Sequence, residues 1–156
     1  MVERCELCGG SADGKSGCQK LFEEGLLVKD YSDYRYGKTH RLTVDVYSLQ
    51  HPEVYMISGK SFAAHLTGVC AALEYKDGAS TNRAVQKWLS TNPPIEKPAR
   101  IPRDRGTITV DHVIGAADIE QHAKRVREWA DSAWNAWSEH HELARQLIAK
   151  AMVHAG

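Results

Sequence analysis

The chain has 156 residues, which is enough for one domain with a buried core. Its 20 basic and 20 acidic residues balance, so no nucleic-acid partner is expected. No apolar run approaches the roughly 20 residues of a membrane span, and the N-terminus has no apolar signal segment. We therefore expect a cytoplasmic protein with no membrane partner. In that reducing compartment, four cysteines indicate metal ligands or free thiols rather than disulfides.

The N-terminal region is expected to be irregular. Residues 1–17 are rich in glycine, serine and cysteine, which predicts a loop with tight turns. A first helix is expected to begin within 16–18 and to end at about Tyr31, because its apolar residues follow helical spacing. Residues 32–37 are then predicted to form a turn.

The segment 40–51 is compatible with two structures. Alternating apolar residues within it favour a strand, but four of its side chains follow the spacing of one helical face: His40, Val44, Tyr47 and His51. Because no partner strand is evident nearby, we predict a helix. Pro52 should end it, since the residue before a proline avoids the helical region.

Two further helices and a long loop are predicted next. The first helix is capped by Ser61 and has an apolar face that includes Cys70. The second is short and spans 81–89. The following segment, 90–108, carries four of the five prolines and is therefore expected to be an extended loop.

The last part of the chain predicts one long helix after a short helical turn at 110–114. Asp118 with Gln121 resembles a capping box, and an apolar stripe continues from there to about Met152. The whole chain, 1–156, is therefore predicted to be a single all-α domain. It would be a bundle of four to five helices with an irregular metal-binding N-terminal loop.

Three cysteines near the N-terminus predict a metal site. Cys5 and Cys8 have the two-residue separation that lets two thiolates reach one ion, and two glycines follow them. Cys18 lies at the expected start of a helix, where the helix dipole favours a thiolate. A redox dithiol and a pair of inert thiols are the alternatives. Cys70 lies on an apolar helix face and is expected in the core.

A structural zinc ion needs a fourth ligand, and chain geometry favours His51. If the first two helices form an antiparallel hairpin, the start of the first lies beside the end of the second, which places Cys18 near His51. His65 is the next candidate. His40 lies roughly 16 Å from His51 along the helix, too far to share the ion. Thiolate ligands favour zinc, with iron and nickel as alternatives.

A second set of polar residues allows an enzyme hypothesis. Side chains from several helices would meet in one pocket, with these catalytic candidates: His40, Asp45, Tyr47, His65 and His141. The plainer interpretation pairs Arg41 with Asp45 on one helix face and leaves His65 as a core histidine. His112, His122 and His154 are expected on the surface.

The chain resembles a bacterial family of small proteins of unknown function. The matching pieces are CELCGG at 5–10, SGC at 16–18, HRLTVDVYSLQHPE at 40–53, HLTGVC at 65–70 and REWADSAWNAWSEHH at 127–141. The resemblance implies the following motif positions: Cys5, Cys8, Cys18, His40, Asp45, Tyr47, Gln50, His51, His65, Trp134, Trp137 and His141. It implies no activity. A looser, fold-level likeness is to the DinB-like metal-binding bundles, whose histidine pattern on the last helix is not reproduced here.

Two functions follow from these patterns. The leading hypothesis is a zinc-binding protein with a structural Cys3His site, formed by Cys5, Cys8, Cys18 and His51. Such a protein would have a recognition or regulatory role toward a protein or small-molecule partner. The alternative is a metal-dependent enzyme, a hydrolase or thiol-dependent transferase, that uses a His/Asp pocket between helices. The basic stretch 100–106 is interpreted as a solvated loop and not as a nucleic-acid site.

Overall fold

The structure is a computed structural model that describes residues 3–156, in which all regular secondary structure is helical apart from one isolated bridge between Arg4 and Ser11. The predicted all-α bundle is therefore confirmed. The elements are α1 (Gly14–Lys20), the π-helical segment η1 (Leu21–Leu27), α2 (Val28–Ser32), α3 (Tyr34–Gly37), α4 (His40–Gln50), α5 (Pro52–Tyr55), α6 (Gly59–Glu74), α7 (Gly78–Leu89), α8 (Val110–Val113), α9 (Ile119–Ala136), the 3-10 turn η2 (Ser138–His140) and α10 (His141–Ala155).

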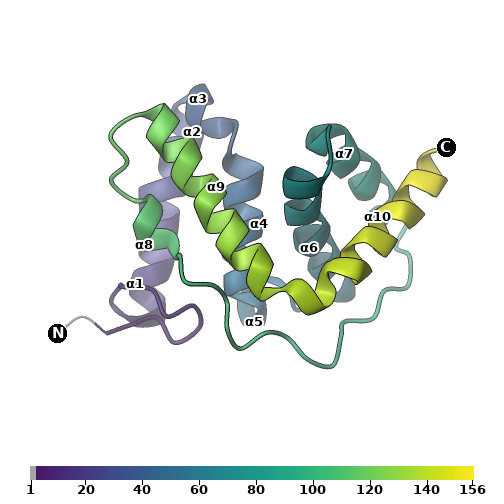
Figure 1. Cartoon of the computed structure of the whole chain (residues 1–156), viewed down its shortest axis with the longest axis horizontal. Helices are drawn as coiled ribbons and strands as arrows, with labels where there is room; N and C mark the ends of the chain where they lie inside the picture. The colour runs from purple at the N-terminus through teal and green to yellow at the C-terminus, as the bar shows by residue number, and fades with distance from the viewer. Residues whose placement is uncertain (1–2) are drawn as a thin grey trace.

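The helices form two groups that meet where α4 packs against α6 (Figure 1). In the first group, α4 packs against α9 and against η1, and α8 lies beside α9. In the second group, α6, α7 and α10 pack against one another. The contact between α4 and α6 joins the two groups into one core. Over residues 3–156, no helix has both the length and the apolarity needed to cross a bilayer.

The first helical stretch begins earlier than predicted. It starts at Gly14 rather than at 16–18, because the loop folds back before the helix: the Gly14 N–H donates to the Glu3 carbonyl at 2.7 Å. Gly14 has a φ of 65°, a left-handed conformation that suits glycine. The stretch then buries one face, on which the Phe22 ring stacks against Tyr47 of α4 at a centroid distance of 3.8 Å.

The helix predicted over 40–51 is confirmed as α4, which ends at Gln50. Pro52 then begins α5, where its missing N–H costs no hydrogen bond. The predicted turn over 32–37 contains the short helix α3, which the Asp33 carboxylate caps by accepting the Arg35 N–H. Local capping therefore makes this turn more regular than its composition indicates.

Both helices of the α6–α7 pair begin before their predicted starts. Ser58, not Ser61, caps α6: the Ser58 hydroxyl accepts the Ser61 N–H, and Ser61 Oγ accepts the Ser58 N–H, both at 3.0 Å. Asp77 caps α7 by accepting the Ser80 N–H at 2.9 Å. Each of these caps satisfies an N–H group that the helix itself leaves unpaired.

The prediction of one long last helix is wrong, because the chain bends at Trp137 between α9 and α10 (Figure 1). Trp137 leaves the helical region, with φ −95° and ψ 20°, and its indole donates to the Leu49 carbonyl at 2.9 Å. The His141 imidazole stacks on Trp134 and donates through Nε2 to the Trp134 carbonyl at 2.7 Å. This bond satisfies a carbonyl at the end of α9. The bend lets α10 return along α6 and α7.

His122 is not on the surface as predicted. It is buried on α9, where its ring meets the Tyr36 ring edge-on and its Nε2 lies 3.3 Å from Thr39 Oγ1. Burial, with the nearby Lys29 charge, lowers the pKa of His122. Cys70 is fully buried on α6, as its apolar face indicates.

Glu74 ties α6 to the last two helices and gives a pH-dependent contribution to stability. Its carboxylate accepts from Arg145 and from the Trp134 indole, both at 2.8 Å. The Arg145 hydrogen bond holds the pKa of Glu74 below its ordinary value, against the opposing effect of partial burial. A carboxyl with a lowered folded-state pKa stabilises the fold above its unfolded-state pKa, and this contribution is lost as the pH falls through the folded-state pKa.

We expect Glu74→Gln to lower the thermal midpoint slightly at neutral pH and not at pH values below the lowered folded-state pKa of Glu74. The pair is partly exposed, so the effect is small. Thermal unfolding of both proteins across this pH range measures it. A midpoint difference that stays constant as the pH falls would contradict the role given to the Glu74 charge.

Candidate metal centre

The N-terminal loop folds into a tight knuckle around Cys5 and Cys8. The Cys5 N–H donates to the Gly10 carbonyl at 3.0 Å, and the Gly9 N–H donates to the Cys5 carbonyl at 2.8 Å. Gly9 adopts a φ of 78°, which a side chain would strain. The Gly10 N–H then lies 3.4 Å from Cys8 Sγ and points at it. Both sulfurs therefore face the inside of the knuckle, and one already accepts a backbone N–H.

Two further ligand-type side chains reach the knuckle from the helices behind it. Cys18 extends from α1 and His51 from the end of α4. The His51 Nε2 atom lies 3.4 Å from Cys18 Sγ and 3.6 Å from Cys5 Sγ, while Cys8 Sγ lies 3.7 Å from Cys18 Sγ. All four ligand atoms lie within 4.8 Å of one another, a group that could hold a metal ion. Cys5, Cys18 and His51 are buried, and Cys8 is half-buried.

The distances match those around a tetrahedral ion. Zinc bonds of about 2.3 Å to sulfur and about 2.0 Å to nitrogen place two sulfurs about 3.8 Å apart, and a sulfur and a nitrogen about 3.5 Å apart. The separations in the structure are 3.7 Å for the Cys8–Cys18 sulfur pair and 3.4 and 3.6 Å for the two sulfur–nitrogen pairs. These three of the six separations match a tetrahedral ion, and all six lie within 4.8 Å.

Tyr47 and the backbone of α4 orient the ligands. The His51 Nδ1–H donates to the Tyr47 carbonyl at 2.8 Å, which leaves Nε2 as the nitrogen that faces the sulfurs. The Tyr47 ring stacks on the His51 ring at 3.9 Å, and its hydroxyl donates to Cys18 Sγ at 3.8 Å. Tyr47 is thus a positioning residue beside the cluster, which its place in the sequence alone did not show.

Two thiols of the cluster, Cys5 and Cys8, have raised pKa values in the absence of a cation. Burial raises the pKa of Cys5, although backbone N–H groups partly oppose it. The hydrogen bond with Cys18, together with burial, raises the pKa of Cys8 to about 12. Three cysteine sulfurs packed this closely repel one another once they ionise, so a divalent cation among them is the group that matches this arrangement.

Arg105 holds the knuckle from outside, and its role corrects our interpretation of 100–106 as a solvated loop. Its side chain is buried, with Nη1 3.1 Å from the Leu7 carbonyl and 3.2 Å from the Gln50 carbonyl. The guanidinium also pairs with the Glu53 carboxylate. Leu7 lies between two of the cysteines and Gln50 precedes His51. Arg105 therefore fixes both halves of the cluster at once.

Gln50 adds a further link between the proline-rich loop and the helices. Its amide donates to the carbonyls of Arg105 and Ile108, each at 2.8 Å, and its oxygen accepts the Trp129 indole N–H at 2.8 Å. The buried amide thus joins the proline-rich loop to α4 and α9. Neither Arg105 nor the partners of Gln50 had a sequence signal, because the contacts span more than 50 residues and follow no periodicity.

The proposed catalytic candidates do not meet in one pocket. Tyr47 belongs to the cysteine cluster, and His141 caps the end of α9. His40, at the opposite end of α4 from His51, pairs with the buried Asp30 through Nδ1 at 3.1 Å. The last two candidates, Asp45 and His65, pair with each other, with His65 Nδ1 2.8 Å from Asp45 Oδ1. The structure therefore separates the set into four environments.

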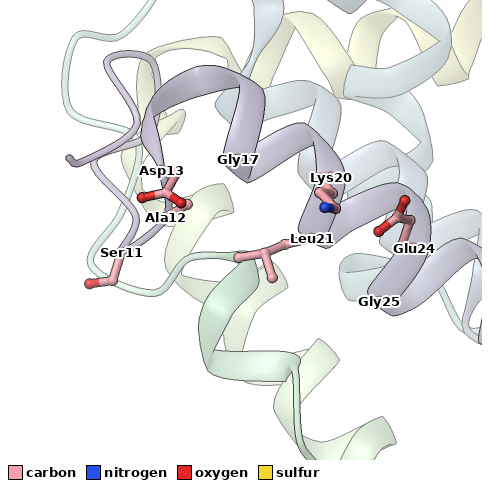
Figure 2. A pocket seen from close by; sticks show the side chains of 8 residues that line it. All are labelled: Ser11, Ala12, Asp13, Gly17, Lys20, Leu21, Glu24 and Gly25. Atoms are coloured by element: carbon pink, nitrogen blue, oxygen red, sulfur yellow. The ribbon is translucent and has the colours of Figure 1, made fainter. Parts of the chain in front are cut away.

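An open pocket of about 510 Å³ lies next to the loop, along the outer side of α1 and η1. Figure 2 shows Ser11 and Asp13 on one side of it and Lys20 and Glu24 on the other, with Leu21 between them. None of the four clustered cysteine and histidine ligands lines this pocket. The ligand cluster therefore does not line the neighbouring pocket.

One protein family matches most of the chain. Its description is a family of unknown function (DUF5946), and the match covers residues 3–138, which include the knuckle, α4 and the Trp134–Trp137 segment. No match was found among curated proteins or among solved structures. On the extent of this match, the chain belongs to the DUF5946 family.

Proposed function

We propose that Cys5, Cys8, Cys18 and His51 hold one zinc ion and that the ion is structural. The observation that carries the proposal is the mutual spacing of the four ligand atoms, all within 4.8 Å. Four protein ligands leave no open coordination position, which is the arrangement of structural zinc sites. Within residues 3–156, no carboxylate belongs to the cluster.

The ligand set supports zinc over the other ions. Three thiolates and one imidazole are soft to borderline donors, which suit zinc and iron better than the hard cations. The tetrahedral spacing of the sulfurs and the nitrogen suits zinc without any electronic preference of the ion. Iron or nickel would use the same four side chains.

The ion would fix the N-terminal loop to α1, through Cys18, and to the end of α4, through His51. Such a role supports recognition or regulation, with a protein or small molecule as the partner and not nucleic acid or a membrane. The chain has no net charge to attract a polyanion. The proposal also assigns the protein to the cytoplasm, where the three thiols would stay reduced and available to the ion.

Metal analysis of the purified protein tests this proposal. We expect about one zinc per chain in the wild type and almost none in Cys5→Ser, because a lost thiolate opens the site. Cys70→Ser is the matched control, since Cys70 is equally buried and lies outside the cluster. Zinc well below half an equivalent in the wild type, or full zinc in Cys5→Ser, would overturn the proposal. An equivalent of iron or nickel would change the ion and keep the ligands.

A further inference from the structure

A second pocket, outside the cysteine–histidine cluster, lies between the first half of α6 and the end of α7. The pocket has a volume of about 400 Å³, within the range of small-molecule sites. Its wall includes Ala64 and Leu89, and its polar groups include Lys60 and His65. No acidic residue lines it. The pocket therefore combines an apolar wall with basic side chains.

His65 presents one defined nitrogen to this pocket. Its Nδ1 lies 2.8 Å from Asp45 Oδ1, so Nδ1–H is the donor to the carboxylate and Nε2 is the nitrogen left for a ligand. The His65 side chain is 20% exposed and lines the pocket, whereas the Asp45 side chain is 1% exposed. A buried carboxylate thus orients a histidine that remains accessible.

Asp45, the carboxylate that orients His65, is itself fully hydrogen-bonded. Arg41 Nε donates to Asp45 Oδ2 at 2.7 Å, so both carboxylate oxygens are paired. Arg41 also donates to the Ala64 carbonyl at 3.3 Å. Gly68 makes room for the carboxylate, because a Cβ there would lie 2.0 Å from Asp45 Oδ2. Burying a carboxylate is costly unless it is paired this well, and here the pairing serves to fix an accessible imidazole.

The charges of the pocket select an anion. Arg41 offsets the Asp45 charge behind His65, so the buried carboxylate does not repel an anion in the pocket. Lys60 supplies a positive charge at the rim, where its ammonium lies 3.4 Å from Asn92 Oδ1. An anionic head group would meet His65 Nε2 and the Lys60 ammonium, and an apolar tail would lie on Ala64 and Leu89.

We propose that this pocket binds a small carboxylate with an apolar chain, with His65 Nε2 as its main polar contact. The site is independent of the metal centre and of the function proposed for it. Its residues come from α6 and α7, with Asp45 and Arg41 of α4 as positioning residues. Nε2 and a carboxylate oxygen are both acceptors, so the complex holds one proton between them that is taken up from solvent on binding.

Titration of the full-length, metal-loaded protein with sodium hexanoate, followed by NMR of the His65 ring, tests this site. We expect a saturable shift of the His65 signals. Hexanoate binding should be about tenfold weaker or worse in His65→Gln and in Lys60→Met, because each loses a charge-assisted bond. His65→Gln keeps a side-chain donor near Asp45, so the fold should persist. Lys87→Met is the control, since Lys87 is exposed on α7 and does not line the pocket.

Hexanol and acetate test the contributions of the carboxylate and of the apolar chain to binding. Hexanol lacks the carboxylate and acetate lacks the chain, so both should bind more weakly than hexanoate. No saturation with hexanoate by about 10 mM would overturn the proposal. Equal binding of hexanol, or unchanged hexanoate binding in His65→Gln, would overturn it as well. Asp45→Asn should weaken binding and shift the His65 ring signals, which separates positioning from direct contact.

Discussion

Removing the metal ion should lower the thermal unfolding midpoint by about 10 °C or more. An ion present at about a thousand times its dissociation constant stabilises the native state by about 4 kcal/mol, and each kcal/mol shifts a domain of this size by about 2–4 °C. The effect follows from the position of the ligands, since Cys18 lies on α1, His51 directly follows α4, and both are buried. Differential scanning calorimetry with and without a strong chelator measures it, and added zinc should restore the midpoint.

Two cysteine variants test whether the chelator lowers the midpoint through the cysteine–histidine cluster. Cys18→Ser should unfold near the temperature of the chelated wild type, and the chelator should then have little further effect. Cys70→Ser, whose cysteine is buried away from the cluster, should keep the full response to the chelator. If chelation leaves the wild-type midpoint unchanged, the ion does not stabilise this fold, and the structural role is wrong.

Replacing Arg105 should weaken both the fold and the metal site. Arg105→Met keeps most of the volume but removes the donors to the Leu7 and Gln50 carbonyls. Bonds from a charged donor contribute about 1.5–3 kcal/mol each, while the half-exposed Glu53 can return to water, so we expect a loss of about 3 kcal/mol. The metal affinity should fall about 10- to 100-fold, as it does when a residue that orients the ligands is lost.

Chemical denaturation and competition with a metal-binding dye measure these two effects. Arg103→Met is the matched control, because Arg103 is exposed two residues away in the same loop. It should change neither the free energy of unfolding nor the metal affinity by much. Equal effects of the two variants would show that the loop contributes through its charge and not through the contacts of Arg105.

The helices could be predicted where residues close together in the sequence define them, through apolar spacing or a proline. The apolar spacing over 40–51 and the proline after it were sufficient for α4. The bend at Trp137 gave no such signal, because the apolar residues continue with helical spacing on both sides of it. The helix end is marked by side-chain contacts, the bond from the Trp137 indole to the Leu49 carbonyl and the bond from His141 to the Trp134 carbonyl. The start of α6 was misplaced because Ser58 and Ser61 are both good caps and cap each other.

For the candidate metal site, the sequence was sufficient to predict the ligands that are close in the chain and those that a helical hairpin brings together. The knuckle has a recognisable spacing, and a helical hairpin was enough to expect Cys18 near His51, which lie 3.4 Å apart between Sγ and Nε2. Arg105 could not be found in this way. Its bond to the Leu7 carbonyl joins residues 98 positions apart, and its neighbours are prolines and charges typical of a solvated loop.

X-ray absorption of the zinc-loaded protein tests the central claim most directly. Three sulfur neighbours at about 2.3 Å and one nitrogen at about 2.0 Å are the predicted shell. His51→Ala should replace the nitrogen with a light atom from solvent and leave the three sulfurs in place. A wild-type shell with an oxygen from water and only two sulfurs would contradict the closed Cys3His site and would point to an ion with an open position.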